Sequence, residues 1–128
     1  MIFIELIHKE LTYKIIGVLY EVFNELGYGY QEKYYQKATA LALKKHGLKF
    51  KEQVYTPVKF QKNKIGKYFL DFVIENKVVL EIKKNDKFFK SDITQLFAYL
   101  KATNLKLGLI ANFTKNGVKI KRIANLNP

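Results

Sequence analysis

Apolar positions recur at helical spacing through the first third of the chain. From about residue 8 to residue 26 they follow one another at intervals of three and four, the spacing of one face of an α-helix, and Gly27 is typical of its end. The same pattern returns over about residues 31–46 and stops at Gly47. The side chains expected to point inward from this second helix are Tyr35, Ala38, Leu41 and Ala42. The pattern predicts two consecutive helices.

The middle of the chain changes to segments typical of strands. Residues 49–60, 67–75 and 78–84 are rich in β-branched and aromatic side chains, and Pro57 interrupts only the first of them. The turn residues Glu75, Asn76 and Lys77 connect the second segment to the third, and three residues is the length of a short hairpin loop. These segments predict three strands, the last two of which form a β-hairpin.

The last third returns to one helix and then to strands. Ser91 or Asp92 is a suitable N-cap for a helix that reaches about Thr103. Residues 107–111 are typical of a buried strand, an Asn-Gly turn follows, and residues 118–124 are typical of a last strand. The whole order predicts an α/β sandwich with a mixed sheet. No linker or repeat divides it, so we expect one domain over the full length of the chain, residues 1–128.

The turn of the predicted hairpin sets its register. A three-residue loop centred on Asn76 pairs Ile74 with Val78. Continuing this register places Asp71 directly opposite Glu81, because both lie five residues from the centre of the loop. Residues that oppose each other share one face of the sheet, with Cβ atoms about 5 Å apart.

Asp71, Glu81 and Lys83 are ionisable side chains within segments that are otherwise almost wholly apolar. Burying a carboxylate without a partner costs several kcal/mol, and Lys83 is expected on the same face as Glu81 by the alternation of side chains along a strand. Oxygen ligands suit a hard cation such as Mg²⁺ or Mn²⁺, and an ammonium stabilises developing negative charge. The cluster predicts metal-assisted phosphodiester hydrolysis. The alternative is a buried salt-bridge network that only sets strand register.

The chain is strongly basic. It carries 23 Lys+Arg against 11 Asp+Glu, a formal net charge of +12. Residues 33–70 hold ten lysines and a single acid, Glu52, and such a surface attracts polyphosphate. Lysine outnumbers arginine 22 to 1, which argues against base-specific recognition by bidentate arginine. The alternative is that most of these lysines only keep the surface solvated.

The remaining composition narrows the class of protein. The 48% hydrophobic and 15% aromatic content exclude disorder, and the absence of cysteine excludes disulfides and a thiolate nucleophile. Residues 1–5 are too short and too soon charged for a signal peptide, and no apolar run reaches the length of a membrane span. We therefore expect a cytoplasmic protein that does not enter a membrane.

Asp71 followed by Glu81-x-Lys83, on the second and third strands of an αβββαβ core, resembles the PD-(D/E)XK nuclease superfamily. Gly29-x-x-Glu32-x-x-Tyr35 resembles the motif of its GxxExxY group. The resemblance extends over nearly the whole chain and includes a later Gln-x-x-x-Tyr sequence in the expected order. It implies a restriction-endonuclease-like fold, with a mixed central sheet flanked by helices and an extra helix at the N-terminus.

The resemblance also implies roles for these residues. Asp71 and Glu81 would be the metal-binding carboxylates and Lys83 the catalytic lysine. Glu32 matches a helix-borne acid that adds a metal or water contact. Taken alone, Glu32 has a second explanation, because an acid in the first turn is favoured by the helix dipole.

Two further positions follow from the same resemblance. Gln95 matches a polar residue that the helix after the third strand directs at the site, and Tyr99 follows one turn later on the same helix face. Both residues are equally compatible with a solvated helix edge, and Tyr35 is compatible with core packing. These three remain candidate site residues with a structural alternative.

The expected function is that of a nuclease dependent on Mg²⁺ (or Mn²⁺) that acts on nucleic acid, with DNA preferred over RNA as the expected substrate. A non-catalytic nucleic-acid-binding module is the first alternative, and a protein-interaction domain that retains the nuclease fold is the second. The aromatic surplus would also suit a homodimer interface.

Overall fold

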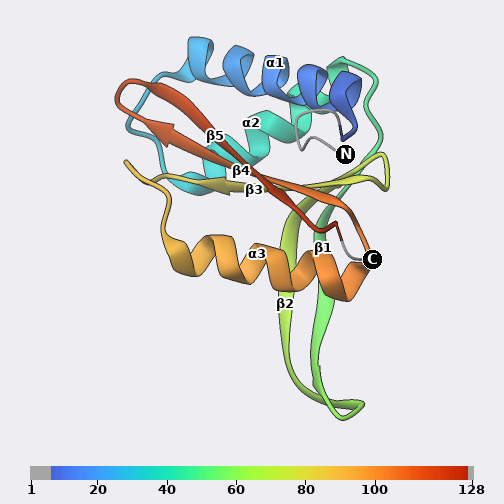
Figure 1. Ribbon diagram of the computed structural model, residues 1–128. Coiled ribbons are helices and arrows are strands. Elements are labelled where there is room, and N and C mark those ends of the chain that lie inside the picture. The colour runs from blue at the N-terminus through green and yellow to red at the C-terminus, as the bar shows by residue number, and fades with distance from the viewer. Residues whose placement is uncertain (1–6, 127–128) are drawn as a thin grey trace.

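A computed structural model describes residues 7–126 as a central five-stranded sheet with helices on both faces (Figure 1). Helices α1 and α2 lie on one face of the sheet, and α3 crosses the other face. The predicted order of helices and strands is confirmed. The elements are α1 (Lys9–Leu26), α2 (Glu32–Lys45), β1 (Phe50–Phe60), β2 (Asn63–Ile74), β3 (Val78–Lys83), α3 (Lys90–Thr103), β4 (Leu107–Thr114) and β5 (Gly117–Ala124).

The strands lie side by side in their order along the chain, from β1 to β5. β3 and β4 are parallel, and the other neighbouring strands are antiparallel. The parallel pair requires a crossover, which α3 supplies. Ile74 pairs with Val78 as the turn predicted. The mixed α/β fold expected from the sequence is therefore confirmed.

Each face of the sheet has its own apolar core. The core on the α1 and α2 side contains Ile15, Leu19, Tyr35, Phe72, Leu80 and Phe113. The core on the α3 side contains Leu70, Val73, Val79, Leu96, Leu100 and Ile110. β3 and β4 contribute to both cores, which explains why they are apolar almost throughout.

Strand β2 turns about its own axis at Asp71. Strict alternation would place Leu70 and Phe72 on the same face, yet Leu70 packs in the core below α3 and Phe72 in the core below α2. Gln53 lies opposite Asp71 on β1, between the paired residues Glu52 and Val54, and it has a positive φ of 49°. This distortion redirects the hairpin, and its distal half extends beyond α3 (Figure 1).

Some local expectations were wrong. Leu41 is 72% exposed, because it lies at the open surface of a groove between α1 and α2 and neither helix covers it. Helix α3 begins two or three residues earlier than predicted, with Phe89 at its N-cap in place of Ser91 or Asp92, and no side-chain capping bond. Ser91 and Asp92 therefore lie in the first turn, and the carboxylate of Asp92 forms an ion pair with Lys83.

The expected absences of a signal peptide and of a membrane span concern different parts of the chain. Residues 1–5, on which the expected absence of a signal peptide depended, lie outside the described part of the chain. Between residues 7 and 126, no helix is long and apolar enough to cross a membrane.

Candidate active site

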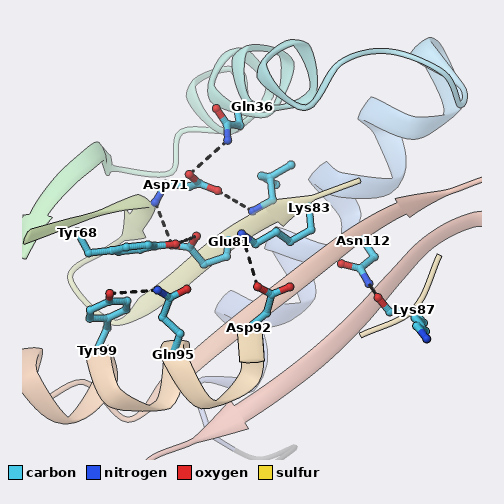
Figure 2. Close-up of polar contacts among 11 residues, drawn as sticks. Gln36, Tyr68, Asp71, Glu81, Lys83, Lys87, Asp92, Gln95, Tyr99 and Asn112 are labelled. Atoms are coloured by element: carbon cyan, nitrogen blue, oxygen red, sulfur yellow. Dashed lines mark hydrogen bonds and ion pairs between the residues drawn. The ribbon is translucent and has the colours of Figure 1, made fainter. Parts of the chain in front are cut away.

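Two acids meet where strands β2 and β3 separate. The backbone ladder ends at Phe72 and Leu80, one position short of the pair predicted between Asp71 and Glu81. At that position each side chain bonds to the other strand (Figure 2). The amide of Asp71 donates to Oε1 of Glu81 at 3.1 Å, and the amide of Ile82 donates to Oδ2 of Asp71 at 2.8 Å. The predicted backbone pair is thus replaced by two carboxyl groups that bridge the strands.

Burial raises the pKa of both acids. Asp71 and Glu81 are only 9% and 4% exposed. Burial raises the pKa of Asp71 above its usual range, against the bond from the Ile82 amide and the charge of Lys83. Burial, and then the nearby charge of Asp71, raise the pKa of Glu81 to about 8. No basic nitrogen of residues 7–126 lies within 4.0 Å of either carboxylate, so the pair retains a proton at neutral pH when no cation is present.

Lys83 ends strand β3 and forms its ion pair with a different acid. Its Nζ lies 3.9 Å from Oδ1 of Asp92, in the first turn of α3 (Figure 2). Its charge lowers the pKa of Asp71 and of Glu81, although burial outweighs that effect. The structure therefore brings Lys83 near the two acids, as predicted, while Asp92 holds its ammonium group.

The loop between β3 and α3 is anchored from the sheet. Asn112 on β4 is the parallel partner of Lys83 and is almost fully buried. Its Nδ2 donates to the carbonyl of Lys87 at 2.9 Å. This bond fixes the loop that separates Lys83 from Asp92, and it is a contact that the sequence did not indicate.

Helix α2 begins beside the two acids. Burial raises the pKa of Glu32, the first residue of the helix, against the charge of Lys83, and the charge of Asp71 raises it further. One turn later, Nε2 of Gln36 donates to Oδ1 of Asp71 at 3.3 Å (Figure 2). Gln36 was not predicted. The signal that would have found it is its position four residues after Glu32, on the same helix face.

Tyr68 is a second residue that the sequence analysis missed. Its hydroxyl donates to Oε2 of Glu81 at 3.2 Å, and its ring stacks on Tyr99 with centroids 4.3 Å apart. Burial, and then the charge of Glu81, raise the pKa of Tyr68, so its hydroxyl remains a donor at any physiological pH. The rotation of β2 at Asp71 hides this residue from a simple alternation rule, which places Tyr68 and Asp71 on opposite faces.

Gln95 and Tyr99 line a small pocket beside Glu81. The pocket has a volume of ≈ 10 Å³, close to the minimum for one water molecule. Its polar lining also includes Lys83 and Asp92. Nε2 of Gln95 lies 3.4 Å from the hydroxyl of Tyr99, and Gln95 is otherwise exposed. Both residues thus face the same space as Glu81.

Tyr35 has a structural position. Its side chain is fully buried and stacks on Phe113, with ring centroids 4.3 Å apart. The hydroxyl donates to the carbonyl of Gly27 and accepts from the amide of Tyr30. Tyr35 therefore fixes the loop that leads to Glu32, and it has no contact with the carboxyl pair.

A family model described as the PD-(D/E)XK nuclease superfamily matches residues 9–123. The chain belongs to this superfamily. No curated protein matches the chain. Among solved structures, one titled "Crystal structure of SSO0001" is similar, with a TM-score of 0.51 and 15% sequence identity over 90% of this chain and 77% of that chain. At this identity the likeness supports the common fold alone.

The carboxyl pair of this PD-(D/E)XK chain has donor chemistry that fits a divalent cation, which nucleases of the superfamily typically use. Each of the four oxygens of Asp71 and Glu81 accepts one hydrogen bond and keeps further acceptor capacity. A cation would offset the repulsion that raises the pKa of Glu81. Over residues 7–126, no group of three or more His, Cys, Asp or Glu side chains is placed to hold a metal ion, so Glu32 does not complete a three-acid site.

Proposed function

We propose that this chain is a metal-dependent nuclease that hydrolyses phosphodiester bonds. The observation that carries the proposal is the burial of Asp71 and Glu81 side by side with no basic group within 4.0 Å in the described part of the chain. Two such carboxylates are stable together only with a proton or a cation between them. Membership of a nuclease superfamily makes the cation the more reasonable partner.

Asp71 and Glu81 would hold a Mg²⁺ (or Mn²⁺) ion, with water and phosphate as its remaining ligands. When bound, the ion would lower the pKa of a water molecule and polarise a phosphoryl oxygen. Gln36 and the Ile82 amide orient Asp71, and Tyr68 orients Glu81.

The other predicted residues have supporting roles in this proposal. The ammonium of Lys83 stabilises negative charge on the phosphoryl group, and Asp92 holds that ammonium at the edge of the pocket. Glu32, whose pKa is raised by burial and by the charge of Asp71, would contact the attacking water. Gln95 and Tyr99 face the pocket in which a water molecule would fit. We assign Tyr35 to the support of the Glu32 loop.

We also propose that the chain belongs to the GxxExxY group and forms one domain over residues 1–128. Supporting observations are the positive φ of 115° at Gly29, which favours glycine, the position of Glu32 near Asp71, and the bond by which Tyr35 anchors the loop that leads to Glu32. DNA is the proposed substrate in preference to RNA. These finer assignments rest on the motif and on the basic charge of the chain.

A second candidate function is a nucleic-acid-binding module without catalysis. The observation that favours it is that every oxygen of Asp71 and Glu81 already accepts a hydrogen bond from the chain. In that case the pair keeps its proton and only stabilises the junction of β2 and β3, while the lysines bind phosphates.

The two candidates are separated by cleavage and by metal binding. Plasmid DNA and a transcript of the same sequence are incubated with the protein and Mg²⁺, and the Asp71→Asn variant is compared with Glu10→Gln, a charge-matched control on the exposed face of α1. We expect nicking by the parent and the control, and a loss of at least about a thousandfold in Asp71→Asn. Binding of nucleic acid without nicking by the parent in Mg²⁺ or Mn²⁺ would establish the second candidate instead.

A further inference from the structure

The distal half of the β1–β2 hairpin, residues 55–69, forms an arm that projects past α3 (Figure 1). Its inner side packs on the core below α3 through Val58 and Tyr68. Beyond them the backbone pairing shifts at Val58 and Lys59, and the tip continues into solvent. We call residues 55–69 the arm.

The outer face of the arm exposes aromatic and aliphatic side chains. Tyr55 and Phe69 are backbone partners on neighbouring strands, with ring centroids 5.8 Å apart and planes at 64°. Each is nearly half exposed. At the tip, Phe60 and Ile65 are 61% and 68% exposed. Exposed apolar side chains gathered on one projecting element are typical of an interaction surface.

The charge of the arm is entirely positive. Its lysines are Lys59, Lys62, Lys64 and Lys67, and it contains no acid and no arginine. The ammonium of Lys64 lies 5.1 Å from the ring centre of Tyr55, and that of Lys67 lies 5.8 Å from the ring centre of Phe69. The ammonium groups therefore lie directly beside the exposed rings. A ligand that carries both an anionic group and an aromatic ring could contact both on this one surface.

The exposed rings lie on the strand that carries the site and on its neighbour. Phe69 is two residues before Asp71, and Tyr55 is two residues after Gln53, which lies opposite Asp71. Two residues along a strand span about 7 Å, roughly the distance between neighbouring phosphates. A nucleic-acid strand laid along the arm is therefore within about one nucleotide of the carboxyl pair.

We propose that the outer face of the arm binds an unpaired nucleic-acid strand, with bases stacked on Tyr55 and Phe69 and phosphates held by the arm lysines. The arm by itself is a binding surface. The direction of the bound strand toward Asp71 and Glu81 rests on the proposed nuclease function.

A single strand fits these observations better than a duplex or an acidic protein. Exposed aromatic rings stack on unpaired bases, whereas the bases of a duplex are already stacked on one another. Lysine without arginine favours contacts to phosphate that are independent of base sequence. An acidic protein would match the lysines, but it would leave the rings without a specific partner.

The test measures binding separately from cleavage. A fluorescein-labelled oligothymidine and a blunt duplex of the same length are titrated with the full chain in a chelator, and anisotropy is followed over a series of salt concentrations. The ring variant is Tyr55→Leu with Phe69→Leu, which keeps apolar contact between the strands. Its control is Tyr13→Leu with Tyr20→Leu on α1, where both rings are also exposed. The melting midpoint of each variant checks folding.

We expect the ring variant to bind oligothymidine at least about tenfold more weakly than the control, with the salt dependence unchanged and duplex binding unaffected. A second variant, Lys62→Gln with Lys64→Gln, should lower the slope of log K against log salt by about 0.7 for each phosphate that the variant no longer binds. Lys9→Gln with Lys14→Gln on α1 is its control and should leave the slope unchanged.

Three results would overturn the proposal. They are equal affinity of the ring variant and its control for oligothymidine, equal loss on the single strand and the duplex, and no binding of oligothymidine by the parent. Binding is measured without metal, and cleavage is measured separately with Mg²⁺ or Mn²⁺. Arm-dependent binding by a chain that cleaves nothing with either metal would support the arm and end the nuclease proposal. Metal-dependent cleavage with no effect of the ring variant on binding would do the reverse.

Discussion

The two halves of strand β2 place charge in opposite surroundings. Residues 70–74 are buried and carry Asp71 next to Glu81. Residues 63–69 are mostly exposed and carry Lys64 and Lys67. In the buried half, burial changes the protonation of the acids. In the exposed half, the lysines remain hydrated and attract anions to the protein surface. One strand thus runs from the buried carboxyl pair to an exposed, positively charged surface.

Two glutamates show the same contrast, because their pKa values are shifted in opposite directions. Glu21 on α1 is well exposed, and its bonds from Lys45 and His46 lower its pKa. Glu81 is buried without a basic partner within 4.0 Å in the described chain, and burial raises its pKa to about 8. The lowered pKa of Glu21 reflects the basic side chains that already bond to it. The raised pKa of Glu81 reflects its burial and the nearby charge of Asp71.

Among the tests that compare the two halves of β2, the largest effect is expected from the lysine nearest the buried acids. Lys83→Met should reduce cleavage by roughly 10²–10³-fold with little change in binding, because it removes a charge that stabilises the reacting phosphate. Lys64→Gln on the arm should weaken binding and leave the cleavage rate at saturating substrate within about threefold of the parent. Single-turnover kinetics separate the two effects. Equal loss of rate in both variants would end the distinction between the two halves of β2.

Glu81→Gln should change how stability depends on pH. In chelator, the unfolded chain releases the Glu81 proton near pH 4.5, whereas the folded chain holds it to about 8. Between these values the folded state binds more protons, so the free energy of unfolding of the parent falls as pH rises and levels off above the folded pKa. Gln cannot ionise, so the variant should lack this fall and exceed the parent at pH 8.5 by an amount on the order of a few kcal/mol.

Urea unfolding at pH 5 and pH 8.5 measures that difference, and Mg²⁺ should reduce it by stabilising the ionised pair. Parallel pH dependence of the parent and Glu81→Gln would show that Glu81 ionises normally in the folded protein.

A smaller effect is expected from the hydroxyl that bonds to Glu81. Tyr68→Phe removes the donor to Oε2, so the pKa of Glu81 should rise further above its usual value. We expect the rising limb of the pH–rate profile to move to higher pH, with less than about a tenfold loss of rate near pH 7. Tyr13→Phe, which removes an exposed hydroxyl from α1, is the control and should leave the profile in place.

The smallest effect is expected at the exposed glutamate. The lowered pKa of Glu21 means that its contribution to stability is present above pH 4.5 and is lost as pH falls through its folded pKa. Glu21→Gln should therefore give a slightly lower melting midpoint than the parent at pH 7 and the same midpoint at low pH. A larger change than that of Glu81→Gln would contradict the contrast between buried and exposed charge.

Local patterns were sufficient for much of the fold. The helices and strands follow from apolar spacing and from Gly27 and Gly47, and the pairing of Ile74 with Val78 follows from the length of the turn. These features depend on residues close together in sequence, which interact in nearly the same way in any fold. The inward position of Leu41 failed because helical spacing shows which residues share a face, but not how far the neighbouring elements extend over it.

The site could be predicted only in part. Asp71 and Glu81 were found because they interrupt apolar segments, and the hairpin register brought them together. Gln36 and Tyr68 were missed because their contacts join elements that are distant in sequence. The ion pair of Lys83 with Asp92 depends on where α3 begins relative to β3, a relation that spacing along the chain does not contain.

The sequence by itself determined which elements form, their order, and the meeting of two acids within an apolar hairpin, because turns and periodicity act over a few residues. Only the tertiary structure decided how those acids are held. The rotation of β2 at Asp71, opposite the strained backbone of Gln53, sends Tyr68 to Glu81 and leaves Asp71 to α2. That rotation arises from the packing of one strand against two different cores, and no single segment of the chain specifies it.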